Sequence, residues 1–414
     1  MHGGAAMTEH YDDLETRPAE AREKALLAEL PAHIAHAKAA APGYAKHLAA
    51  IDPAAVTSRA ELAELPLTRK SDLTSAQALD LPFGGMTTLP PGRLRRIFAS
   101  PGPIYEGESH GIDHWRTARA LFATGFREGD ILQNCFAYHF TPAGVMFETG
   151  AEALGCAVIP AGTGNTELQA RTMADLQPRG YVGTPDFLKL ILEKADQLDH
   201  DTRSVTLAHV SGGPLLPPLR EFYSARAIDV FQSYGTADLG LIAYETEGRG
   251  GLVLAEGILV EIVRPGTGEP VPEGEVGEVV VTSFDRCSPL IRFATGDLSA
   301  ILPGRSPCGR TAPRLRGWLG RADQSTKVRG MFVHPGQVAE VLKRHDLARG
   351  RLVVASRQGI DEVTLQVEAA DAAIADAVAE TLADVTKLRA AVAVVPPGSL
   401  PNDGKVIDDT RKLA

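Results

Sequence analysis

A regular alternation of short apolar runs and longer amphipathic segments, between residues 130 and 232, constrains the fold of this chain more than any other feature. Five apolar runs of four to eight residues are separated by four segments with helical spacing. Strands joined through helices pair in parallel, and helices then cover both faces of the sheet. The sequence therefore predicts an α/β fold. The expected strands are 131–138, 157–160, 180–183, 207–210 and 229–232, and the expected helices are 142–154, 166–176, 185–198 and 217–225.

Segments on either side of this alternation have a different pattern. Residues 10–50 show helical spacing, in which Pro31 is expected to break or restart the helix. Further on, apolar runs at 257–260 and 278–281 flank a turn-rich stretch, 265–270. This pattern indicates hairpins and a small antiparallel β-barrel within the same large N-terminal domain.

A short charged stretch bounded by Gly320 and Gly330 divides the chain, and a compact segment follows it. A chain of 414 residues is long enough for two domains with separate cores. The expected domains are therefore a large N-terminal one, 1–322, and a small α+β one, 323–414. In the small domain we expect helices at 337–344 and 371–388, a hairpin of 351–354 with 363–367 about Gly359, and a last strand at 391–395.

The charge and the cysteine content bear on the class of protein. Lys and Arg total 42 against 52 Asp and Glu, a net charge of −10, which disfavours binding to nucleic acid. No apolar run approaches the ~18 residues needed to span a bilayer, so no membrane partner is expected. Four widely spaced cysteines without a Cys-x-x-Cys pair are typical of a reducing compartment, and the cytoplasm is the expected location.

Small, polar and aromatic residues follow the expected strands at their carboxyl ends. In open parallel sheets, ligands bind at this edge. Side chains of these kinds suit a pocket for a nucleotide and an aromatic acid. They are Tyr138 and His139, residues 162–165, Thr184, residues 211–213 and residues 233–238.

Four short motifs occur in a fixed order: Ser-Tyr-Gly-Thr-Ala-Asp at 233–238, Arg-Phe-Ala-Thr-Gly-Asp-Leu at 292–298, the charged stretch at 320–330, and Leu-Pro-Asn-Asp-Gly-Lys at 400–405. Their order and spacing resemble the core motifs of the adenylate-forming superfamily of acyl-CoA synthetases, peptide-synthetase adenylation domains and luciferases. Residues 130–166, 306–311 and 396–401 look most like phenylacetate-CoA ligases within it. The resemblance covers most of the chain.

The resemblance implies a reaction in two steps. A carboxylate attacks the α-phosphate of Mg-ATP and yields an acyl-adenylate and pyrophosphate. The small domain then swings, and a thiol, usually that of coenzyme A, displaces AMP. Because an anion attacks an anion in the first step, cations must hold the phosphates and the reactants must lie in line. The expected substrates and cofactors are a small-molecule carboxylic acid, ATP, Mg²⁺ and coenzyme A, and a homodimer is expected because relatives often form one.

By the same resemblance, eight residues bind the nucleotide. Tyr234 would stack on adenine, and the carboxylate of Asp297 would accept hydrogen bonds from the ribose hydroxyls. Asp238 stands where the family usually has a metal-holding glutamate, one methylene longer, and is expected to hold Mg²⁺. The nucleotide-binding residues are Gly212, Gly213, Ser233, Tyr234, Gly235, Thr236, Asp297 and Arg321.

Two further roles follow from the resemblance, and the ends of the expected strands indicate an acyl pocket. Lys405 matches the lysine of the last motif, which bridges carboxylate and phosphate oxygens, and is the expected catalytic residue. Asp323 matches the hinge about which the small domain rotates. No zinc site is expected, because His139 has no second ligand at metal spacing. The expected acyl pocket, suited to an aromatic or short carboxylic acid, contains Tyr138, His139, Phe140 and Thr184.

The phosphate loop departs most from the family pattern, which is a run rich in Ser, Thr and Gly that ends in Gly-Lys. The corresponding stretch, 98–107, retains Ser100 and Gly102 but has neither the threonines nor the lysine. Pro103 removes an amide donor, and Glu106 adds negative charge where phosphates would lie.

This loop leaves three hypotheses open. The chain is an aryl-CoA ligase with a divergent phosphate loop, or an adenylating enzyme of a biosynthetic pathway with an acceptor other than coenzyme A, or a catalytically weak binding protein on the same fold. We take the first as the main hypothesis, because a pure scaffold has no need for the retained set of Lys405, Asp297, Tyr234 and Arg321.

Overall fold

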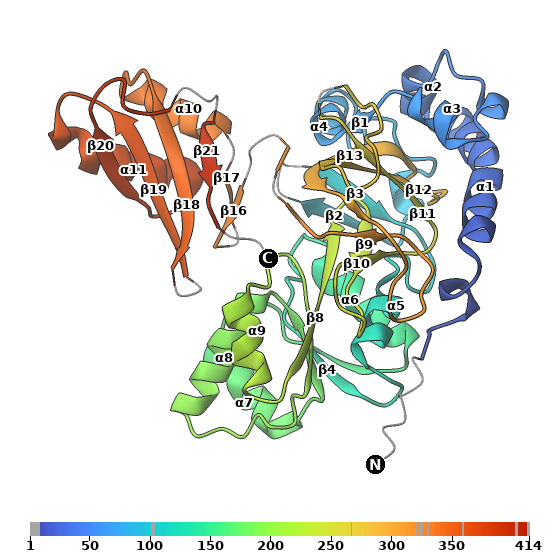
Figure 1. The fold of residues 1–414 in the computed structure, drawn as a ribbon, viewed down its shortest axis with the longest axis horizontal. Coiled ribbons are helices and arrows are strands. Elements are labelled where there is room, and N and C mark those ends of the chain that lie inside the picture. Colours follow the sequence, from blue (N-terminus) through green and yellow to red (C-terminus); the bar gives the residue numbers. More distant parts are fainter. Residues whose placement is uncertain are drawn as a thin grey trace. The chain divides into compact units, whose positions relative to one another are not determined.

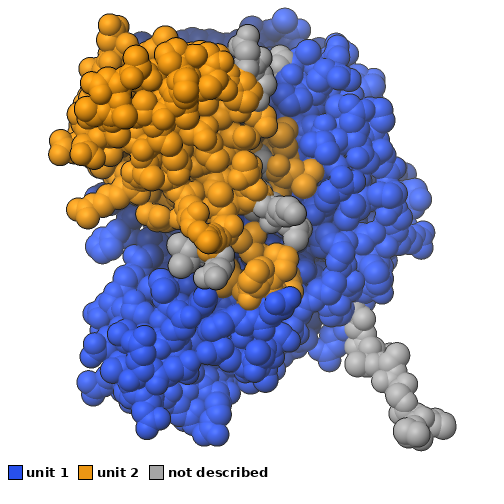
Figure 2. Space-filling model, turned by 60° about the vertical axis from the view of Figure 1, so that its left-hand side comes forward, with its two compact units in different colours: residues 1–215, 221–295, 299–317 blue, residues 216–220, 296–298, 318–414 orange. Residues whose placement is uncertain are grey.

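A computed structural model describes residues 9–100, 104–265, 267–319, 321–322, 326–329, 331–333, 335–357, 360–401 and 405–411 (Figure 1). The chain forms two compact units, which Figure 2 distinguishes by colour. The first comprises Met1–Leu215, Glu221–Thr295 and Ser299–Gly317, and the second comprises Leu216–Arg220, Gly296–Leu298 and Trp318–Ala414. The domain limits given from the sequence, 1–322 and 323–414, stay a prediction.

The first unit is built on a nine-stranded sheet with the order β14-β15-β10-β9-β8-β7-β6-β4-β5. The five strands from β5 to β8 pair in parallel, as predicted, and β9 then pairs antiparallel to β8. All four residues of both β6 and β7 are buried, as expected for strands covered on both faces. The bounds are β4 Ile131–Asn134, β5 Ala157–Pro160, β6 Gly180–Gly183, β7 Leu207–Val210, β8 Asp229–Thr236, β9 Gly240–Tyr244, β10 Leu252–Leu254, β14 Ile301–Leu302 and β15 Arg314–Leu315.

Helices α6 to α9 connect the parallel strands at nearly the predicted positions, whereas α5, which precedes β4, was not predicted. Helix α5 packs against α6, and α7 against α8, and Figure 1 shows these two pairs on opposite sides of β8. Their apolar faces supply much of the core, with Leu121, Met173 and Leu188 fully buried. The bounds are α5 Thr117–Thr124, α6 Ala143–Ala153, α7 Thr166–Leu176, α8 Pro185–Gln197 and α9 Pro217–Ser224.

The first predicted strand, 131–138, is too long. Strand β4 ends at Asn134, because the side chain of this residue bonds the chain that follows. Its Oδ1 accepts the Phe136 amide at 3.1 Å, and its Nδ2 donates to the Gly144 carbonyl at 2.7 Å and to the Tyr138 hydroxyl at 2.9 Å. Such local side-chain bonds compete with a strand ladder and turn the backbone out of the sheet.

A second sheet of the first unit has the order β1-β13-β12-β11. Strands β11 and β12 form the predicted antiparallel hairpin, and β1 pairs parallel to β13. A further hairpin consists of β2 and β3, and helix α4 follows β1 directly. The closed barrel stays a prediction. The bounds are β1 Thr68–Arg69, α4 Lys70–Leu79, β2 Arg96–Ser100, β3 Ile104–Glu108, β11 Ile258–Val263, β12 Gly277–Ser283 and β13 Leu290–Ser299.

The N-terminal helix corrects one expectation. Helix α1, Ala19–Ala40, continues through Pro31 instead of breaking there. A proline inside a helix costs about 3 kcal/mol through a lost hydrogen bond and a clash. Here buried Leu30 and Ile34 hold both flanking turns in one core, together with residues of α2, Pro42–His47, and α3, Arg59–Ala63. Packing therefore outweighs the local preference.

The second unit is a small α+β fold with the sheet order β20-β19-β18-β21. Strands β18 and β19 form the predicted hairpin, and helices α10 and α11 contact each other. Val341, Leu352, Leu365 and Leu382 belong to its core. The bounds are β16 Thr326–Val328, β17 Met331–Val333, α10 Pro335–Arg344, β18 Gly350–Arg357, β19 Ile360–Glu368, α11 Ala375–Thr386, β20 Ala391–Val395 and β21 Ile407–Asp409.

The expectations about the cysteines and about membrane-spanning segments can be compared with the described residues. All four cysteines are free thiols, and Cys135, Cys156 and Cys308 are buried. Among the described helices, none has the length and apolar character needed to cross a membrane.

Candidate functional site

The ends of strands β7 and β8 bring two predicted nucleotide-binding segments together. Ser211, the residue after β7, donates a hydrogen bond from its hydroxyl to the Ser233 carbonyl at 2.9 Å. Gly212, next in the chain, has a φ of 72°, which side chains of L-residues rarely tolerate. Parallel pairing of β7 with β8 thus places the glycine turn beside the Ser233–Thr236 segment.

A histidine inside the sheet fixes the start of this segment. His209 on β7 is fully buried, and its Nδ1 and Nε2 lie 2.8 Å from the Thr124 hydroxyl and 2.9 Å from the Ser233 hydroxyl. Thr124 uses its own proton to bond the Ala120 carbonyl, so the His209 Nδ1–H donates to Thr124 and Nε2 accepts the proton of Ser233. Burial lowers the pKa of His209 to about 3, so the ring is neutral at pH 7 and can act as that acceptor.

Tyr234 and Gly235 lie where β8 approaches β9. The register of the two strands shifts between these residues. A Cβ atom at position 235 would lie 2.5 Å from the Gly240 carbonyl oxygen, so only glycine fits. The Tyr234 hydroxyl donates to the Thr295 hydroxyl at 3.2 Å, and Thr295 in turn donates to the Val279 carbonyl at 2.9 Å. Tyr234 is therefore connected to strand β13.

Asp297 lies two residues beyond Thr295 on the same strand. Its side chain is 10 % exposed, and its Oδ1 accepts hydrogen bonds from the Trp318 indole at 2.8 Å and from Arg321 Nη1 at 3.0 Å. Gly296 has a φ of 74°, and a Cβ there would lie 2.5 Å from Arg321 Nη2. The glycine of this motif therefore allows Arg321 to reach Asp297. Two residues that the sequence singled out separately are in direct contact.

A cluster of polar side chains surrounds Asp238, in the turn between β8 and β9. Lys70, the first residue of α4, donates to Asp238 Oδ2 at 3.1 Å and to the Ser100 hydroxyl at 3.3 Å, and its Nζ lies 3.7 Å from Glu106 Oε1. The Ser100 hydroxyl donates to the same Glu106 oxygen at 2.5 Å. Sequence reasoning missed Lys70, since a lysine at a helix start carries no local signal of this role.

Glu106 is the most perturbed carboxylate of this cluster. Burial, together with the nearby charge of Asp238, raises the pKa of Glu106 to about 8, and Lys70 opposes the shift. Glu106 Oε2 and Asp238 Oδ1 are buried atoms without a hydrogen-bond partner. Within the described residues, no group of three or more His, Cys, Asp and Glu could hold a metal ion. One or two carboxylates nevertheless suit Mg²⁺, which takes further ligands from phosphates and water. The orphaned oxygen of Asp238 therefore fits the expected metal role.

The expected acyl-pocket residues differ in exposure. Tyr138 is half-buried, and burial and the neighbouring Glu148 both raise its pKa. Thr184 is half-buried too, and its carbonyl accepts the Tyr181 hydroxyl at 3.0 Å. His139 is exposed, and Phe140 is 77 % exposed. Their shared role in binding an acyl group stays a prediction.

Three other predicted residues have no described place in this site. Gly102 and the hinge residue Asp323 lie outside the described residues. Lys405 belongs to the second unit, where its Nζ donates to Asp408 Oδ1 at 3.0 Å and its side chain is 53 % exposed. The catalytic role of Lys405 and the hinge role of Asp323 stay predictions.

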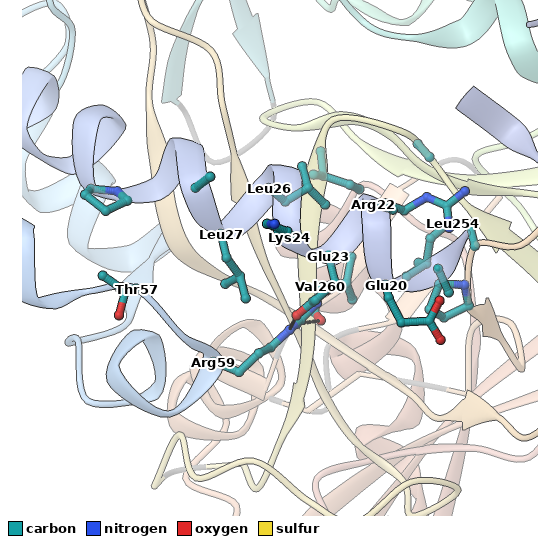
Figure 3. Close-up of a pocket in the computed structure, with 17 residues that line it drawn as sticks. Glu20, Arg22, Glu23, Lys24, Leu26, Leu27, Thr57, Arg59, Leu254 and Val260 are labelled. Atoms are coloured by element: carbon teal, nitrogen blue, oxygen red, sulfur yellow. Dashed lines mark hydrogen bonds and ion pairs between the residues drawn. The ribbon is translucent and has the colours of Figure 1, made fainter. Parts of the chain in front are cut away.

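A separate pocket of about 830 Å³ lies along the first half of α1 (Figure 3). Arg59 crosses it, with Nη1 donating to the Val260 carbonyl and Nε to Glu23, each at 2.6 Å. Leu26 and Leu27 contribute apolar walls. None of the residues expected to bind a nucleotide or an acid lines this pocket, so we do not assign it to the reaction.

Comparisons with known proteins indicate the family of this chain. Residues 112–284 match the family model described as AMP-binding enzyme. The chain is 32 % identical over 354 residues to a phenylacetate-coenzyme A ligase of Aromatoleum evansii, covering 81 % of this chain and 79 % of that protein. The protein of the same name from Thermus thermophilus is 29 % identical over 394 residues, covering 91 % and 87 %.

A solved structure also matches nearly the whole chain. It is that of 2-hydroxyisobutyryl-CoA ligase in complex with 2-HIB-AMP and CoA, with a TM-score of 0.82 at 26 % identity. The match covers 97 % of this chain and 92 % of that one. The chain thus belongs to the adenylate-forming, AMP-binding enzymes, in the family of the phenylacetate-coenzyme A ligases.

Proposed function

We propose that this protein activates a carboxylic acid with ATP as an acyl-adenylate and transfers the acyl group to coenzyme A. The observation that carries the proposal is the placement of the Gly212 turn beside the Ser233–Thr236 segment, where the Ser211 hydroxyl donates to the Ser233 carbonyl. Within the second unit, Arg321 binds the Asp297 carboxylate. An aromatic ring, a buried carboxylate and a guanidinium are the groups that adenine, ribose and phosphate require. The relatives named phenylacetate-coenzyme A ligases support the same reaction.

The nucleotide is proposed to bind at the ends of β7 and β8. Tyr234 stacks on adenine, and the backbone of Gly212 and Gly213 approaches the base. Asp297 accepts hydrogen bonds from the ribose hydroxyls, for which a carboxylate is suited. Ser233, Gly235, Thr236 and Arg321 complete the nucleotide site. The neutral ring of His209 holds Ser233 in place, which supports a preformed site.

Mg²⁺ is proposed to be held by Asp238. When bound, the cation neutralises charge on the phosphates as the carboxylate approaches. Lys405 is the proposed catalytic residue, which stabilises the negative charge that develops between the carboxylate and the α-phosphate. Ser100 and Gly102, the residues retained from the phosphate-loop pattern, are proposed to lie near the phosphates.

For the second step, we propose that the C-terminal domain rotates about Asp323 as a hinge. The thiolate of coenzyme A then attacks the acyl carbonyl, and AMP leaves. Asp323→Pro should therefore reduce thioester formation more than adenylation, and an equal loss of both would argue against the hinge. A homodimer is also proposed, which light scattering of the full chain would test.

The acid is proposed to be aromatic or short, with Tyr138, His139, Phe140 and Thr184 at its pocket. The test is acid-dependent pyrophosphate exchange with a panel of aryl and short carboxylic acids, followed by addition of coenzyme A. Exchange without a thioester would favour an acceptor other than coenzyme A. Nucleotide binding without exchange for any acid would favour a binding protein, which the departure of the phosphate loop from the family pattern makes the main competing function.

A further inference from the structure

Glu106 and Asp238 are two carboxylates in which only one oxygen of each has a hydrogen-bond partner. Glu106 lies on β3 and is 7 % exposed, while the side chain of Asp238, in the turn after β8, is 5 % exposed. One oxygen of each is engaged: Glu106 Oε1 by Ser100, and Asp238 Oδ2 by Lys70. The other oxygen of each, Glu106 Oε2 and Asp238 Oδ1, is buried without a hydrogen-bond partner.

The two carboxylates share a single ammonium group. Lys70 Nζ lies 3.1 Å from Asp238 Oδ2 but 3.7 Å from Glu106 Oε1, so Glu106 is the less well compensated of the pair. Buried polar oxygens without a hydrogen-bond partner cost free energy and are rare in native proteins, so two of them in one cluster point to a bound ligand. A cation that contacts both orphaned oxygens would satisfy them at once.

The chemistry of the donors indicates which cation fits. Carboxylate oxygens are hard ligands, and Mg²⁺ is commonly bound by one or two carboxylates while phosphates and water fill its other positions. Since the described residues contain no third acidic, histidine or cysteine ligand here, the remaining positions stay open to a nucleotide. The pair is therefore suited to a metal that arrives together with ATP.

We propose that Glu106 is a second protein ligand, beside Asp238, for the divalent cation that accompanies the nucleotide. This inference rests on the proposed function. In this role Glu106 does not repel the phosphates but binds them through the metal. The phosphate loop then depends on a divalent cation where the family pattern has a lysine.

Whether Glu106→Gln weakens or tightens ATP binding distinguishes a metal ligand from a residue that only repels phosphates. The full chain, without acid or coenzyme A, is titrated calorimetrically with Mn·ATP and, in EDTA, with metal-free ATP. If Glu106 is a ligand, Glu106→Gln weakens binding of Mn·ATP by about tenfold or more, since even outer-shell partners of metals are worth that much. If Glu106 only repels phosphates, the same change tightens binding of both forms, and the proposal is overturned.

Three further variants and a spectrum complete the test. Asp238→Asn should also weaken Mn·ATP, Glu106→Asp should give an intermediate affinity, and Glu152→Gln, an exposed carboxylate on α6, should change nothing. The electron paramagnetic resonance signal of Mn²⁺ reports bound metal independently of turnover. If wild-type chain binds neither form of ATP, the proposed function itself fails. If it binds Mn·ATP and Glu106→Gln binds as tightly, only the second-ligand role fails.

Discussion

The buried ring of His209 should make the stability of the first unit depend on pH in the acid range. Burial lowers its pKa from 6.5 to about 3, so the folded state holds the ring neutral where the unfolded chain would protonate it. A group with a lowered pKa in the fold contributes stability above its unfolded pKa, and this stability falls as pH drops toward the folded pKa. The sensitive window for His209 therefore runs from pH 6.5 down to about 3.

The size of the effect follows from the shift. Each pH unit below 6.5 costs about 1.4 kcal/mol, so about 3 kcal/mol is lost between pH 6.5 and pH 4.5. Both ring nitrogens are bonded to hydroxyls, Thr124 and Ser233, and the proton added at Nε2 would face the hydroxyl proton that it now accepts. Protonation thus breaks the bond that holds Ser233.

The assay uses a Trp318→Phe background, in which the fluorescence of the remaining Trp115, 2 % exposed, reports the first unit alone. In this background, the chain with His209 is compared with His209→Gln by urea unfolding between pH 7 and pH 4.5. The difference in free energy of unfolding should change by about 3 kcal/mol over this range. His110→Gln, an exposed histidine of the same unit, is the matched control and should leave the pH dependence unchanged. Parallel curves for wild type and His209→Gln would refute the reasoning.

Other substitutions test the site and the core. Lys405→Ala should lower pyrophosphate exchange by about 100-fold or more while ATP binding persists, since the lysine acts on developing charge; equal loss of binding and exchange would contradict that role. Gly296→Ala should weaken ATP binding measured by calorimetry, because a Cβ would strike Arg321 and the positive φ costs about 1–2 kcal/mol; unchanged affinity would argue against a role for Arg321. Arg292→Met should cost about 3–5 kcal/mol in urea unfolding, since it leaves buried Glu261 unpaired; a cost below about 1 kcal/mol would refute this.

Local patterns were reliable where they coincided with packing. The strands β5, β6 and β7 and helix α7 have the predicted bounds, because short apolar runs between turn residues leave few alternatives. The patterns failed where a single side chain or a long-range contact determined where a strand or helix ends. Asn134 ends β4 through bonds to its neighbours, and the core around Leu30 carries α1 through Pro31.

The site shows the same division. The family motifs could be recognised in the sequence, since motifs are local in the chain, and they predict the site residues Tyr234, Asp238, Asp297, Arg321 and Lys405. Which side chains meet depends on how distant segments pack. Lys70 and Asp238 are 168 positions apart, and their contact depends on how α4 and the β8–β9 turn pack. The same holds for Glu106, which the sequence alone indicated would only oppose the binding of phosphates. Burial beside Asp238 gives it a specific environment, because desolvation and proximity are properties of the folded chain.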